Sequence, residues 1–148
     1  MGQRIGIDVG GTNVKIALVS DEGKIIYSNS IPTRAEMGYE YTINSMKDAI
    51  RELLKETKLE AKDIEGMGFG FPGQIDCQKG IVRLAPNIPG WVNVPIADIM
   101  EKEFGIPTRV DNDVRTEIEN EAARYILDNP ENFGLQLFKF RRRSLSYD

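Results

Sequence analysis

Two short apolar segments near the amino terminus, residues 4–8 and 13–19, are joined by a turn that contains the dipeptide Gly10-Gly11. Gly-Gly between apolar runs of this length is typical of a tight β-hairpin, because glycine adopts the backbone angles that such turns require. The beginning of the chain therefore predicts two antiparallel strands. This hairpin restricts the fold more than any other feature of the sequence.

The same turn carries groups that suit a polyphosphate. Its glycines allow backbone N–H groups to approach phosphate oxygens without a Cβ in the way. Asp8 stands just before the turn, whereas Thr12 and Lys15 follow it and add a hydroxyl donor and a positive charge. A carboxylate such as Asp8 suits hydrated Mg²⁺, which prefers carboxylate, water and phosphate ligands. From this turn alone, a plain hairpin and a phosphate-binding turn stay equally open.

Periodicity and turn residues predict the other elements. Apolar residues recur at helical spacing between residues 42 and 57, and charged residues fill the opposite face. A second helix is expected to begin at Pro95, a favoured first-turn residue, and to end at Gly105. The predicted strands are residues 4–8, 13–19, 24–31, 66–71, 80–85 and 107–110, and the predicted helices are residues 42–57, 95–104 and 114–128.

This order of elements predicts an α/β fold. Three strands form a meander, and strands then alternate with helices, which implies parallel crossovers. A mixed five-stranded sheet (β-β-β-α-β-α-β-α) with helices on its faces follows, and ligands of such sheets bind beyond the carboxyl ends of the strands. We expect one domain over residues 1–133 and a divergent basic tail over residues 134–148, in which residues 139–143 carry a charge of +4.

Composition argues against several classes of function. The net charge of −4 disfavours nucleic-acid binding, and the basic patch at residues 139–143 is short and terminal. No apolar run approaches the about 18 residues of a membrane span, and no signal peptide is evident. The single cysteine, Cys77, suits a reducing cytoplasm. With one cysteine and no histidine, no conventional zinc site is expected in this chain.

Three later segments place polar residues where predicted strands end. They are residues 70–76 (GFPGQID), residues 84–91 (LAPNIPGW) and residues 110–113 (VDND). Polar groups in such loops can converge on one ligand. We expect Asp111 to be a loop or turn residue rather than a second base, and Cys77 to have no chemical role. Trp91 is expected to pack in the core rather than to stack on a sugar.

Five segments in this order resemble the amino-terminal lobe of the ROK family of repressors and sugar kinases: DVGGTNVK, FGFPGQID, GIVRLAPNIPGW, VPIADIMEKEFGIP and VDND. The resemblance covers roughly residues 3–116 and is closest to glucokinase-like members. It implies a ribonuclease-H-like lobe of the actin-like ATPase type, as in the actin, Hsp70 and hexokinase superfamily.

The resemblance also implies site residues. Asp8, Gly10, Gly11, Thr12 and Lys15 resemble the family's first phosphate motif, which binds ATP, with Asp8 holding Mg²⁺ through water. Gly73, Asn87, Asn112 and Asp113 resemble its sugar-binding positions. Asp113 resembles the catalytic base, since a carboxylate in hydrogen-bond reach orients a sugar hydroxyl and accepts its proton. Asp113 also suits the N-cap of the helix predicted at 114–128, and the two roles are compatible.

The resemblance implies a cytoplasmic enzyme that transfers phosphate from ATP to a hexose or an amino sugar. It fades after Asp113, where Arg115 takes a position that is usually small, and we expect the second lobe of a complete kinase to be absent. Little or no kinase activity is then expected, because such kinases close two lobes around their ligands. Exposed apolar surface then favours a homodimer.

The sequence leaves other functions open. The main alternative is a non-catalytic sugar-binding or regulatory ROK protein. A DNA-binding repressor is disfavoured because the chain starts directly at its first strand. A nucleotide-binding protein that shares only the first motif is disfavoured by Asn87 and by the Asn112-Asp113 pair.

Overall fold

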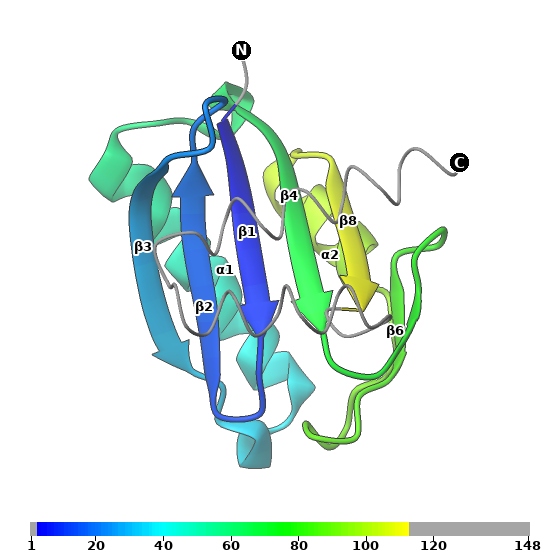
Figure 1. Cartoon of the computed structure of the whole chain (residues 1–148). Coiled ribbons are helices and arrows are strands. Elements are labelled where there is room, and N and C mark those ends of the chain that lie inside the picture. The colour runs from blue at the N-terminus through cyan, green and yellow to red at the C-terminus, as the bar shows by residue number, and fades with distance from the viewer. Residues whose placement is uncertain (1–2, 113–148) are drawn as a thin grey trace.

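A mixed five-stranded sheet lies at the centre of the computed structural model, which describes residues 3–112 (Figure 1). Its strand order is β3-β2-β1-β4-β8. The strands are β1 (Gln3–Val9), β2 (Asn13–Val19), β3 (Ile25–Pro32), β4 (Ile64–Phe71) and β8 (Thr108–Asn112). β2 pairs antiparallel with β1 and β3, whereas β4 pairs parallel with β1 and β8. The predicted hairpin and the predicted mixed sheet are both confirmed.

Two helices pack on one face of this sheet, behind it in the view of Figure 1. They are α1 (Tyr39–Thr57) and α2 (Ile96–Phe104); the 3₁₀ turns η1 (Ala35–Met37) and η2 (Ala61–Asp63) lie outside them. Neither described helix is long and apolar enough to cross a membrane. The helix predicted at 114–128, the basic tail and Asp113 lie outside the described residues.

A second, three-stranded sheet follows β4 and was not predicted as such. It consists of β5 (Gln74–Asp76), β6 (Ile81–Leu84) and β7 (Val92–Val94), antiparallel and in the order β5-β6-β7. Only its middle strand was expected from the sequence. The two outer strands are three residues long, which is too short to show the alternation by which strands are recognised.

The two faces of the large sheet differ because side chains alternate along each strand. Ile5, Ile7 and Val9 of β1 and Met67, Phe69 and Phe71 of β4 belong to the main core, together with apolar residues of α1 and α2. The residues between them, which include Asp8, Gly68 and Gly70, occupy the opposite face. The chain therefore uses one face of the sheet for packing and leaves Asp8 on the other.

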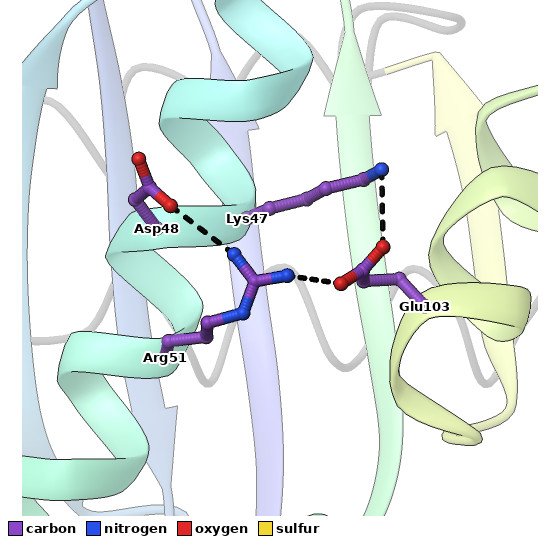
Figure 2. Close-up of polar contacts among 4 residues, drawn as sticks. All are labelled: Lys47, Asp48, Arg51 and Glu103. Carbon is purple, nitrogen blue, oxygen red and sulfur yellow. Dashed lines mark hydrogen bonds and ion pairs between the residues drawn. The ribbon is translucent and has the colours of Figure 1, made fainter.

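An ion cluster joins the two helices (Figure 2). The carboxylate of Glu103 on α2 accepts hydrogen bonds from Lys47 and Arg51 on α1, with a Lys47 Nζ to Glu103 Oε1 distance of 3.2 Å. Arg51 also bonds Asp48 at 3.1 Å, and its guanidinium lies 5.5 Å from the centroid of the Phe104 ring. The Lys47 hydrogen bond and both positive charges hold the pKa of Glu103 below its ordinary value of 4.5.

The substitution Glu103→Gln tests this cluster. Because the pKa of Glu103 is lowered in the folded state, its stabilising contribution is present above the ordinary pKa and is lost as the pH falls through the folded pKa. We expect Glu103→Gln to lower the melting temperature slightly at pH 7 and to match the wild type once the pH lies below the folded pKa of Glu103. Thermal unfolding followed by circular dichroism measures both. Glu56→Gln, an exposed change on the same helix, is the control and should have no such pH dependence.

Candidate functional site

The predicted site residues that the structure describes gather at one edge of the large sheet. β1, β4 and β8 run parallel, so their carboxyl ends meet at the lower edge in Figure 1. β1 leads into the turn at residues 10–12, β4 leads into Pro72 and Gly73, and β8 ends at Asn112. The parallel register therefore brings the turn at residues 10–12, which is predicted to bind phosphate, to the same edge as Gly73 and Asn112, which are predicted to bind sugar.

Asn87 reaches this edge from the loop between β6 and β7. A Cβ built on Gly11 would lie 3.4 Å from the carbonyl oxygen of Asn87 and 3.7 Å from its Cβ. Both Gly11 and Asn87 are exposed. The turn expected to bind phosphate and the loop expected to bind sugar thus lie close together, although 76 positions separate these two residues in the sequence.

A polar row crosses the face of the sheet opposite α1. Asp8 lies directly across from Lys15 on β2 and from Gly70 on β4, and Gly70 lies across from Asp111 on β8. Residues in direct register share one face of a sheet. Since Gly70 has no side chain, nothing from β4 fills the space between the two carboxylates. Lys15 places a positive charge beside Asp8 at the start of the candidate phosphate site.

The β1–β2 turn needs glycine at residue 10 for reasons of space. The N–H of Gly10 donates to the carbonyl of Asn13 at 2.9 Å, and a Cβ on Gly10 would lie 3.0 Å from that same oxygen. Gly11 and Thr12 follow on the exposed side of this tight closure. The turn is therefore compact at its base and accessible at its tip, where a phosphate could approach.

Asn112 and Gly73, both predicted to contact the sugar, are brought together. The side-chain amide of Asn112 donates to the carbonyl of Gly73. Gly73 has φ +125°, and a Cβ there would lie 2.2 Å from the carbonyl oxygen of Leu84. Only glycine fits this position, because both its backbone angle and its neighbour exclude a side chain. The turn after β4 is thereby held against β6.

The expectation that Asp111 is a turn residue was wrong. It lies within β8 and its residue is only 5% exposed. Its carboxylate accepts the N–H of Asn112 at 2.7 Å and the thiol of Cys77 at 3.1 Å. The strand extends this far because its pairing with β4 continues to Phe71. The sequence-based prediction ended the strand at residue 110, because the polar residues Asp111 and Asn112 are typical of a turn. Cys77 and Asp111 together fix the backbone that carries Asn112.

Trp91 packs in the core, as predicted. It is 1% exposed, its ring centroid lies 4.9 Å from that of Phe71, and Tyr39 meets it edge-on at 6.1 Å. The carbonyl of Trp91 accepts the N–H of Ala85 at 3.3 Å, which closes the loop that contains Asn87. Trp91 therefore anchors the Asn87 loop on the end of β4 and is not a platform for sugar stacking.

Among residues 3–112, no three histidine, cysteine or acidic side chains gather as they would in a metal cage. Asp8 supplies one carboxylate beside an exposed turn, which fits a Mg²⁺ ion held mainly by phosphate and water. Asp113, the predicted base, follows directly after Asn112 in the sequence, but it lies outside the described residues.

Comparison with known proteins agrees with this geometry. The sequence profile of the ROK family matches residues 4–125. The chain belongs to the ROK family. The glucokinase of Thermotoga maritima is 42% identical over 112 residues, which are 74% of this chain and 33% of that enzyme. The xylose repressor of Caldicellulosiruptor bescii is 33% identical over 113 residues, which are 76% of this chain and 28% of the repressor.

A solved structure supports the fold. The ROK glucokinase of Streptomyces griseus, crystallised with glucose and AMPPNP, superposes with a TM-score of 0.66 at 30% identity and covers 76% of this chain and 33% of that protein. The predicted actin-like ROK lobe is thereby confirmed as the fold. The chain spans about a third of the length of these relatives.

Substitution of Gly73 tests the packing of the site edge. We expect Gly73→Ala to lower the free energy of unfolding by about 1–3 kcal/mol more than Gly90→Ala. Gly90 also has a positive φ, +93°, but a Cβ there meets nothing within 4 Å, so it serves as the control for backbone strain alone. Urea unfolding of both variants measures the difference. Equal losses would show that the contact with Leu84 does not restrict residue 73.

Proposed function

We propose that this chain forms the amino-terminal lobe of an ATP-dependent hexose kinase. The proximity of Gly11 and Asn87 is the observation that supports the proposal, because the turn proposed to bind phosphate lies beside the loop whose side-chain amide is proposed to bind the sugar. The bond from Asn112 to Gly73 adds a second polar group at the same edge. A kinase needs its phosphate and its acceptor hydroxyl next to each other, since most of its catalysis is positioning.

Each residue of the site then has a distinct task. The N–H groups of the turn at residues 10–12 and the ammonium of Lys15 hold phosphate oxygens. Asn87 and Asn112 hydrogen-bond hydroxyls of the sugar. Asp113 accepts the proton of the attacking hydroxyl as the phosphoryl group moves. Asp8 would hold a Mg²⁺ ion through water, and the ion would neutralise charge on the phosphate.

The choice of ligands is supported by relatives. The Streptomyces griseus structure is described with glucose and AMPPNP, an ATP analogue. We therefore propose ATP with Mg²⁺ as the cofactor pair and a hexose or an amino sugar as the substrate. Cytoplasmic location and homodimer formation stay predictions, of which sedimentation of the pure chain tests the second.

A non-catalytic sugar-binding or regulatory protein is the second candidate. The 33% identity to a xylose repressor favours it, because that relative is named for regulation. The two candidates share a sugar site and differ in phosphoryl transfer. Asp113 is the residue that separates them, since only the kinase needs a base there.

Calorimetry with glucose tests the sugar site on the 148-residue chain. We expect measurable glucose binding that Asn87→Ala weakens about fivefold to tenfold, because about one sugar hydrogen bond is lost. Asn44→Ala, an exposed change on α1, is the matched control and should bind as the wild type does. The absence of glucose binding, or equal binding by Asn87→Ala, would contradict the proposed sugar site.

A coupled assay with ATP, Mg²⁺ and glucose tests the chemistry. These residues span about a third of the glucokinase relatives, so we expect little turnover by this chain alone. Turnover that Asp113→Asn abolishes would show that the chain completes a kinase site. Turnover that Asp113→Asn leaves unchanged would contradict the assignment of the base.

A further inference from the structure

Two fully buried threonines lie beneath the turn at residues 10–12. Thr33 is 0% and Thr42 1% exposed. Within the described part of the chain, buried polar or charged side chains occur at four positions, namely Thr33, Thr42, Thr108 and Asp111. A buried hydroxyl is costly unless it is hydrogen-bonded, and an apolar residue of the same size is available in valine. The hydrogen bonds of these threonines therefore indicate what they do.

Thr33 bridges the two sides of the turn. Its Oγ1 donates to the carbonyl of Gly10, on the β1 side, at 2.7 Å, and its N–H donates to the carbonyl of Thr12, on the β2 side, at 2.8 Å. Thr42, in the first turns of α1, in turn donates from its Oγ1 to the carbonyl of Thr33 at 2.8 Å. The turn is thereby connected to α1 through two buried hydroxyls.

The direction of these bonds decides which way the turn presents its amides. In a trans peptide unit the C=O and the following N–H point to opposite sides of the chain. Holding the Gly10 carbonyl toward buried Thr33 turns the N–H of Gly11 away from it. Holding the Thr12 carbonyl in the same way turns the N–H of Asn13 outward. Residues 11–13 are all exposed, so this part of the turn is accessible to a ligand.

We propose that Thr33 is a positioning residue for phosphate binding, and that Thr42 fixes Thr33. The proposal rests on the proposed function in that it assumes phosphate at this turn. Thr33 keeps two carbonyl dipoles, which would repel a phosphate, directed inward and two amides directed outward. It also restricts a Gly-Gly turn that would otherwise lose much conformational freedom on binding. The hydroxyl thus orders the turn before the ligand arrives.

The test uses three variants of the ¹⁵N-labelled chain and MgATP as the probe. Thr33→Val removes the hydroxyl and keeps the shape of the side chain and its N–H. Thr33→Ser restores the hydroxyl and serves as the conservative rescue. Thr108→Val is the matched control, because Thr108 is 5% exposed and donates from Oγ1 to the carbonyl of Ile106 at 2.8 Å. Thr108 begins β8, at the opposite end of the sheet from the turn.

In the MgATP titration, chemical shifts of the Gly11 and Asn13 amides report binding. We expect Thr33→Val to weaken MgATP at least about fivefold, the loss that corresponds to one hydrogen bond, and Thr33→Ser and Thr108→Val to stay within about twofold of the wild type. Equal affinity in Thr33→Val, or an equal loss in Thr108→Val, overturns the proposal.

Amide hydrogen exchange without ligand tests the ordering of the turn separately from phosphate binding. Gly10 N–H bonds the carbonyl of Asn13 across the turn, and we expect it to exchange at least about fivefold faster in Thr33→Val than in Thr108→Val. If the wild-type chain does not bind MgATP, the phosphate part of the proposed function fails, and this exchange rate still decides the role of Thr33. Equal exchange in the two variants refutes the positioning of the turn by Thr33.

Discussion

The parallel pairing of β4 with β1 and β8 is the constraint on which the site depends. It sets three strands in one direction and in one register, with Asp8, Gly70 and Asp111 in a line. The three carboxyl ends therefore meet, and the segments that follow them have to share one edge of the sheet. A shift of one residue in either pairing would move Asp8 or Asp111 to the helix-covered face. Burial of Phe69 and Phe71 against the helices fixes that register.

The loops at this edge pack closely on one another. Gly73 lies against the backbone of Leu84, Gly11 against Asn87, and Trp91 closes the Asn87 loop over Phe71. Packed interiors compress little, so these close contacts keep the loops in a fixed arrangement. The loop proposed to bind the sugar is therefore held beside the turn proposed to bind phosphate.

The sequence was sufficient to predict the helices and strands whose apolar residues recur at a clear period. It was insufficient for elements that are too short or too polar to show such a period. The Gly10-Gly11 hairpin and the apolar stripe of α1 were predicted within a few residues, because both depend on local spacing. β5 and β7 are too short to show alternation. Asp111 looked like a turn residue, since its place in β8 depends on pairing with β4 and its burial on Cys77. Thr33 belongs to no recognisable sequence motif. Its hydrogen bonds to Gly10 and Thr12 join residues that are distant in the sequence, so only the structure shows them.

The main core lies on one face of the large sheet, and residues proposed to contact ligands lie on the other face or at its edge. The main core lies on the helix-covered face, and the Lys47–Glu103 ion pair joins the two helices there. Substitutions on this face are therefore expected to change the free energy of unfolding. Lys15 and Asn87 lie on the other side or at its edge and contribute little to the core. Gly73 and Thr33 are different, because each orders a loop of the proposed site through a close contact with its backbone. A ligand site ordered in this way is rigid before binding, which lowers the entropy that binding costs.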